Sequence, residues 1–204
     1  KENEKEENSP NSIIIPCEFT TPCLTNPPNH PTHPRKVISH IFGRNKTATK
    51  LFPAHVWIHY CRKHYQRARY RSSQWPFTQC ELLGDSLARM QAWGGVDWFE
   101  VCLRRREVMR VFGSAATSMK GREDADDADD DDDEEKKRRK KPLIVPAPVP
   151  GWLRLEIAGG EPKSFDQVRE LVRLIRQDME RVRDAGGQVR FPDIEILPVF
   201  KGWV

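Results

Sequence analysis

Four side chains have the types and spacing that suit a zinc ion. Cys17 and Cys23 flank a short stretch that reads as a loop, and Cys61 and His64 lie three residues apart further along the chain. On a helix, two residues at this separation project from one face, so both can reach the same ion. Zinc binds four such nitrogen or sulfur ligands in a tetrahedron. The sequence therefore predicts a Zn²⁺ site formed by Cys17, Cys23, Cys61 and His64.

Other assignments of these residues are open at this stage. The three further histidines that can replace one of the four ligands are His30, His33 and His40. Alternatively, Cys61 is a small buried apolar residue and His64 is a surface base. We expect Cys80 and Cys102 to lie on apolar helical stripes and to belong to the core.

The region around Cys61 is basic and contains no acid. No Asp or Glu occurs from Leu24 to Cys80, although the net charge of the whole chain is only +4. Such a surface binds polyanions by releasing their counterions, whereas the competing interpretation is a solvated helix face. We expect duplex DNA as the partner, with RNA as the alternative because nearby aromatic residues also suit single strands. The predicted contacts are Arg44, Asn45, Lys46, Arg62, Lys63, Arg67, Arg69 and Arg71.

Two charged blocks follow in the second half of the chain. Residues 123–135 are almost wholly acidic, and KKRRKKP comes directly after them. This basic run is typical of a nuclear localisation signal, with Lys136, Lys137, Arg138, Arg139, Lys140 and Lys141 as its residues. Alternatively, the two blocks pair with each other, or the acidic block mimics DNA and folds back on the basic region. The acidic block is also a candidate site for a protein partner.

Composition limits the class of protein. The chain has 204 residues, 37% of them hydrophobic and 31% charged, with 16 prolines and five cysteines. A small core of this kind usually needs a staple such as a metal. No apolar run approaches the roughly 18 residues of a membrane span, so we expect no membrane association. No apolar signal segment opens the chain, which favours a reducing compartment, and together with the basic run this predicts the nucleus.

Periodicity predicts an α+β fold that is mostly α. We expect a flexible tail at 1–12, a zinc-clipped basic domain at 13–113, a disordered linker at 114–150 and a C-terminal helix with an extended segment at 151–204. Within the basic domain the pattern predicts a small ββα-type finger with a strand at about 36–42 and a helix at about 53–71. Further helices are expected at about 77–93 and 98–112. A capping box at Ser164 and Gln167 begins the C-terminal helix, which is a separate docking element or packs back on the domain.

The basic region also resembles a known family. VISHI, GRNK and CRKH, which lie between Val37 and His64, resemble the HNH or His-metal finger pattern. In that family a histidine matching His40 activates water, and downstream Asn or His residues hold a catalytic metal. Here Ser39, Val56 and Tyr65 stand where the family has an acid, an Asn and the last His. The head domain of SMAD transcription factors is a non-catalytic relative of that fold.

The chain as a whole resembles a largely uncharacterised group of fungal proteins. The motifs that carry this resemblance are HIFGRNK, HVWIHYCRKHYQRARYR and the closing FPDIEILP. It implies a nuclear role associated with DNA. We therefore expect a zinc-dependent DNA-binding protein connected with transcription. The alternatives are an HNH-type metal-dependent nuclease with His40 as general base, and a protein-interaction scaffold without catalysis.

Overall fold

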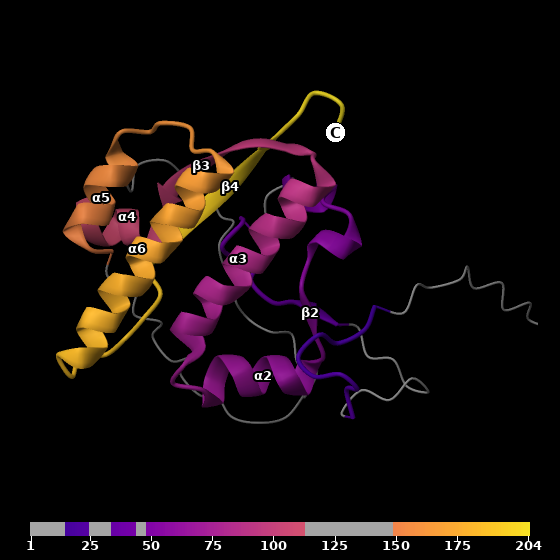
Figure 1. The fold of residues 1–204 in the computed structure, drawn as a ribbon. Coiled ribbons are helices and arrows are strands. Elements are labelled where there is room, and N and C mark those ends of the chain that lie inside the picture. The colour runs from indigo at the N-terminus through magenta and orange to yellow at the C-terminus, as the bar shows by residue number, and fades with distance from the viewer. Residues whose placement is uncertain (1–14, 25–33, 44–47, 113–148) are drawn as a thin grey trace, which may run out of the picture.

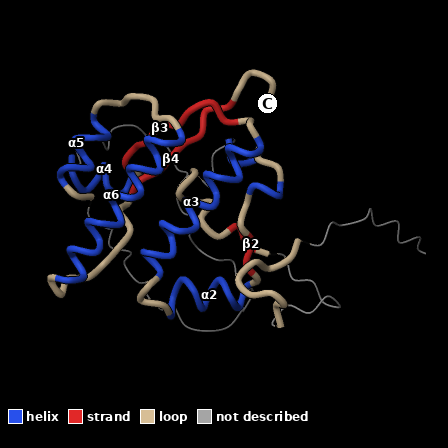
Figure 2. The backbone as a smooth tube through the Cα atoms, viewed as in Figure 1, coloured by secondary structure: helices blue, strands red, loops and turns tan. Residues whose placement is uncertain are grey.

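The computed structural model describes residues 15–24, 34–43, 48–112 and 149–204, whose arrangement Figure 1 shows. Figure 2 shows that helices make up most of the regular structure and that the strands are few. In chain order the elements are β1 (Arg35–Lys36), α1 (Ala48–Leu51), the 3₁₀ helix η1 (Ala54–Val56), β2 (His59–Tyr60), α2 (Arg62–Arg71), α3 (Trp75–Trp93), β3 (Val96–Leu103), α4 (Arg105–Phe112), α5 (Gly151–Ala158), α6 (Phe165–Asp184) and β4 (Ile194–Phe200). The fold is α+β, as the sequence predicts, and within the described residues the strands form two small antiparallel sheets.

Several predicted features lie outside the described residues. These are the DNA contacts Arg44, Asn45 and Lys46, the localisation residues 136–141, and the alternative ligands His30 and His33. The expected tail at 1–12 and most of the expected linker at 114–150 lie outside them as well. Among the helices that the structure describes, none combines the length and the apolar character needed to cross a membrane.

The first sheet is smaller than predicted. β1 pairs antiparallel with β2, with Arg35 opposite Tyr60 and Lys36 opposite His59. The expected strand at 36–42 is wrong, because the chain turns after Lys36 and the N–H of Ile41 donates to the carbonyl of Ile38 at 2.9 Å. In such a turn, side chains three residues apart, here those of Ile38 and Ile41, point in the same direction. Both isoleucines are about 1% exposed, so the turn buries them together against the core.

The predicted helix at 53–71 begins later than expected. α2 starts at Arg62, and the preceding residues form η1 and β2. Val56 at the end of η1 is buried, and so are Trp57 and Ile58, which lead into β2. A consecutive run of buried β-branched and aromatic residues suits an extended segment covered on both faces better than a helix with one apolar face.

The predicted helix at 98–112 is wrong over its first half. Residues Val96–Leu103 form β3, which pairs antiparallel with β4, and α4 follows. Phe99 and Val101 are buried while Glu100 between them is exposed. This alternation has the period of a strand, and the aromatic and β-branched residues favour one. The alternation of buried and exposed residues therefore indicates a strand here, although the same apolar residues also fit one face of a helix.

The two long helices form where the sequence predicts them. α3 ends at Trp93, and Gly94 follows as its C-cap: its N–H donates to the carbonyl of Met90 at 3.0 Å, and its φ of 79° turns the chain out of the helix. At the start of α6 the Ser164 N–H donates to Gln167 Oε1 at 2.8 Å, and the Gln167 N–H donates to Ser164 Oγ at 3.3 Å. These bonds satisfy helix-end groups that otherwise have no partner in the helix.

Residues 149–204 share one hydrophobic core with the earlier part of the chain. α6 lies beside α3, and an ion pair of 3.2 Å between Arg176 and Glu81 joins them. The N–H of Ile196 in β4 donates to the carbonyl of Ile41 at 2.8 Å. The rings of Phe52 and Phe200 pack edge to face at 5.0 Å. The C-terminal strand thus packs on the turn that follows β1.

One buried carboxylate holds two distant parts of the backbone together. The side chain of Glu107 in α4 is fully buried and accepts a hydrogen bond from the N–H of Val149 at 3.2 Å. Arg110 donates from Nε to the same carboxylate at 2.7 Å. The hydrogen bond from Arg110 lowers the pKa of Glu107 and outweighs the effect of burial, so the carboxylate is charged.

Helix α5 offers a matched test of this core. Leu153 is 0% exposed and Leu155 is 78% exposed on the same helix. Leu153→Ala removes buried contacts and leaves a cavity, so we expect it to lower the free energy of unfolding by about 2–5 kcal/mol. Leu155→Ala is the control and should change it by less than about 0.5 kcal/mol. Urea titration followed by circular dichroism measures both, and equal effects would show that α5 does not pack as described.

Candidate metal centre

The four predicted ligands converge in the folded chain. Their ligand atoms, one from each residue, all lie within 4.8 Å of one another, and they form a group that can hold a metal ion. Cys17 Sγ lies 3.4 Å from His64 Nδ1, and Cys23 Sγ lies 3.5 Å from the same nitrogen. The two sulfurs of Cys23 and Cys61 are 3.9 Å apart. Three of the four side chains are buried, and Cys23 is half-buried.

These distances fit a tetrahedral zinc site. With Zn–S near 2.3 Å and Zn–N near 2.05 Å, the edges of a tetrahedron are about 3.8 Å between sulfurs and about 3.6 Å between sulfur and nitrogen. The observed 3.4, 3.5 and 3.9 Å lie close to these edges. A disulfide needs sulfurs about 2.05 Å apart, and the cysteines are free thiols. The donor set of three cysteines and one histidine is one of the usual structural zinc sets.

Two segments bring the ligands together. Cys17 and Cys23 lie on the loop before β1, and the N–H of Glu18 donates to the carbonyl of His59 in β2 at 2.8 Å. Cys61 is the residue that precedes the first turn of α2, and His64 lies within that turn. Because the two are three residues apart across the helix start, both face the loop. The small β1–β2 sheet thus leads directly into the metal-binding end of α2.

Backbone groups stabilise a thiolate at Cys17. The N–H of Cys61 donates to Cys17 Sγ at 3.1 Å. Burial leaves the pKa of Cys17 raised overall, and hydrogen bonds from the backbone of Cys61 and Phe19 offset part of that rise. Donors of this kind favour the charged sulfur, which is the form that binds a metal. They therefore act as supports around the ligand itself.

His64 is held as a neutral imidazole. Burial, followed by the nearby charge of Arg67, lowers the pKa of His64 below its ordinary value. The neutral ring is the form that ligates a metal. The ring of Phe19 stacks on His64 with centroids 4.5 Å apart and an angle of 24° between the planes. This stacking restricts the orientation of the imidazole.

Glu18 ties the loop to the rest of the fold. Its carboxylate pairs with Arg89 of α3, and its Oε1 accepts from the N–H of His59 at 2.9 Å. Burial raises the pKa of Glu18, but the hydrogen bonds from Arg89 and from the His59 backbone outweigh it and leave the pKa lowered. Arg89 also donates to the carbonyl of Trp57 at 3.0 Å. A charged Glu18 therefore connects the loop, β2 and α3.

The remaining predicted residues have separate positions. Arg62, Lys63, Arg67 and Arg71 are exposed on α2, and Arg69 is half-buried against Tyr65. His40 does not belong to the four-ligand group and lines a separate pocket near β1. Cys80 is buried in α3, and Cys102 is half-buried in β3, where the sequence predicts a helix.

Sequence reasoning missed the residues that support the ligands. Glu18, Phe19 and Arg89 act through contacts between distant segments, and sequence spacing carries no sign of a partner seventy residues away. One signal was present, because Glu18 directly follows Cys17 and is the last acid before the long stretch without acids. In a region so poor in acids, a single carboxylate beside a ligand suggests a structural ion pair.

Comparison with known proteins gives no family for this chain. No family model, no curated protein and no solved structure matches it.

Metal content tests the site directly. We expect about one zinc per chain in protein purified without chelators, because the four donors match a structural zinc set. Cys61→Ala removes one ligand and should lose the zinc, together with helical signal from α2. Cys102→Ala is the control, since Cys102 lies outside the group. Elemental analysis and circular dichroism provide the two readouts, and an unchanged zinc content in Cys61→Ala would contradict the assignment.

Proposed function

We propose that this chain is a zinc-dependent DNA-binding protein of the nucleus with a role in transcription. The observation that carries the proposal is the charge on α2. This helix has no acidic residue and exposes Arg62, Lys63, Arg67 and Arg71. Ion pairs between described residues include none of Lys63, Arg67 and Arg71.

Helix α6 shows what a compensated cationic helix looks like in the same protein. Its arginines pair with acids on their own helix, at 2.8 Å for Arg169 and Asp166 and at 2.6 Å for Arg173 and Glu170. Such pairs cancel the charge locally and leave little potential at a distance. α2 has no acid of its own that can do this. An uncompensated cationic face is the surface that attracts phosphates.

The metal centre would present this face to a partner. One side of α2 and of its N-cap is buried, and it carries Cys61, His64, Tyr65 and Ala68. The cations therefore project from the other side. Anchoring at the first turn fixes both the position and the rotation of the helix. Because the helix is already ordered before binding, less conformational entropy is lost when its side chains enter a groove.

The types of side chain suggest separate tasks at the interface. Arginine can donate two hydrogen bonds to a guanine edge, whereas lysine contacts are mostly to phosphates. Tyr70 is 62% exposed, and the guanidinium of Arg69 lies 5.3 Å from the centre of its ring. This pair offers a flat surface for sugar or base contacts. We include Arg44, Asn45 and Lys46 in the interface, and residues 136–141 as the nuclear localisation signal, on sequence grounds.

The salt dependence of DNA binding tests the role of α2. The slope of log K against log salt concentration is negative, and removing one phosphate-binding cation should reduce its magnitude by about 0.9. Arg67→Gln with Arg71→Gln should therefore weaken duplex binding and reduce the magnitude of the slope by about 2. Arg173→Gln with Arg183→Gln is the matched control on α6, where both arginines pair with acids. Fluorescence anisotropy over a salt series measures the slopes. Weak binding that is insensitive to salt in the wild type would instead favour the scaffold.

A metal-dependent nuclease is the second candidate, and the position of His40 favours it. His40 lines a pocket near β1 beside cationic side chains, and Gln79 Nε2 lies 3.4 Å from its Nε2. Among the described residues, however, the four-ligand group is the one cluster of three or more potential metal ligands. A nuclease needs a second, catalytic ion at the scissile phosphate.

Plasmid cleavage separates the two candidates. For a DNA-binding protein we expect supercoiled plasmid to stay intact with magnesium, because the described residues offer no second metal cluster. Nicking that disappears in His40→Ala and persists in His55→Ala, a control on the exposed η1 helix, would establish the nuclease instead. Gel electrophoresis of the plasmid gives the readout.

A further inference from the structure

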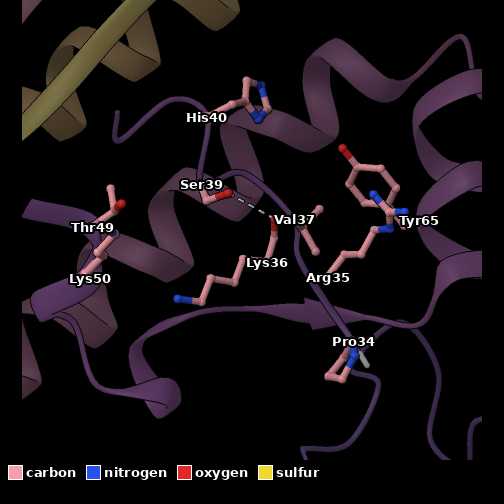
Figure 3. Close-up of a pocket in the computed structure, with 9 residues that line it drawn as sticks. All are labelled: Pro34, Arg35, Lys36, Val37, Ser39, His40, Thr49, Lys50 and Tyr65. Atoms are coloured by element: carbon pink, nitrogen blue, oxygen red, sulfur yellow. Dashed lines mark hydrogen bonds between the residues drawn. The ribbon is translucent and has the colours of Figure 1, made fainter. Parts of the chain in front are cut away.

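A recessed pocket lies between β1, α1 and the buried side of α2. Its volume is about 350 Å³, at the lower end of the range for small-molecule sites. Figure 3 shows the side chains that line it, with Arg35 extending toward Tyr65 and Lys36 extending toward the side where Lys50 lies. Tyr65 belongs to α2, so the pocket adjoins the helix that carries the proposed DNA contacts.

The described lining of the pocket is cationic. Arg35, Lys36 and Lys50 contribute to its walls, and none of the described lining residues carries a carboxylate. Within the described residues neither lysine forms an ion pair. Lys36 instead lies over the Trp57 ring, with its Nζ 5.0 Å from the ring centre. Partial burial lowers the pKa of Lys36, although the residue as a whole is exposed.

The neutral groups in the pocket suit an oxyanion as well. Arg69 donates to the hydroxyl oxygen of Tyr65, which leaves the Tyr65 O–H hydrogen as a donor. Thr49 and His40 add a hydroxyl and an imidazole to the wall. Donor groups around one hollow, with lysine charges and no carboxylate among the described lining residues, form a set of groups that phosphate can bind.

We propose that this pocket binds a phosphate monoester, and that its source is the terminal phosphate of a nucleic acid strand held against α2. The inference rests on the proposed DNA-binding function and names a ligand for one part of that surface. A bridging phosphodiester carries one negative charge, whereas a terminal monoester carries ~1.5–2 near pH 7. A cationic pocket therefore prefers the terminus. Its volume also accommodates more than a bare phosphate, which fits a phosphate with its attached sugar.

The proposal predicts a preference for phosphorylated ends. Duplexes of identical sequence with a 5′-phosphate, a 3′-phosphate or hydroxyl ends are compared by fluorescence anisotropy with the zinc-loaded full chain. We expect about tenfold tighter binding of one phosphorylated duplex than of the hydroxyl duplex, the size of one charge-assisted hydrogen bond. Lys36→Gln with Lys50→Gln should reduce the preference to less than about twofold. Arg71→Gln is the control and should weaken all duplexes equally.

A second readout does not depend on DNA. Thermal unfolding of the same proteins is followed with a nucleoside monophosphate, with inorganic phosphate and with the unphosphorylated nucleoside. We expect stabilisation of the wild type by the two phosphates and a loss of that stabilisation in the double variant. Lys36 and Lys50 are exposed, so the variant should fold, and circular dichroism checks this.

The outcomes separate the pocket from the wider proposal. Equal binding of phosphorylated and hydroxyl duplexes by the wild type overturns the terminal-phosphate site and leaves DNA binding intact. Stabilisation by nucleoside monophosphate without any duplex binding supports the pocket and overturns the DNA-binding function. A preference that survives in the double variant overturns the assignment to these lysines.

Discussion

The convergence of four ligand atoms is the constraint on which the basic half of the fold depends. Cys17 and His64 are 47 positions apart along the chain and 3.4 Å apart in space. The β1–β2 sheet has two residues in each strand, which is too short to be stable alone. The ligand cluster, the Glu18–Arg89 ion pair and the buried apolar residues around Trp57 together hold the loop, the sheet and the start of α2. A bound ion would add its binding energy to folding at this point.

Charge is distributed unevenly between the two helical parts. α6 carries arginines and acids that pair along its own surface, and Arg176 also reaches Glu81 on α3. α2 carries four arginines and one lysine without acids. Like charges along a helix repel each other and weaken it in isolation. The fold tolerates α2 because its first turn is anchored and Tyr65 and Ala68 are buried. The same uncompensated positive charge would attract the nucleic acid that we propose as its partner.

The sequence predicts the ligand set, the long helices and the extended segment that contains β4, but it predicts β2 and most of β3 as helix and gives β1 wrong bounds. Cys61 and His64 give a reliable signal because helix geometry links their spacing to one face. The Ser164–Gln167 capping box is equally local and appears as predicted. β3 was missed because its partner β4 lies almost a hundred residues away, and pairing at that distance overrides the helical periodicity of the same residues. The pocket at Lys36 was missed for the same reason, since its walls come from β1, α1 and α2.

The carboxylate of Glu107 has a consequence for how the sequence between α4 and α5 can vary. By accepting the N–H of Val149, it brings the backbone that enters α5 beside α4. The two places where residues 113–148 join the described fold therefore lie close to each other. The entropy of closing a chain segment between two such places grows only with the logarithm of its length, about 0.6 kcal/mol for each doubling. The segment between them can therefore lengthen or shorten at little cost to the stability of the folded part.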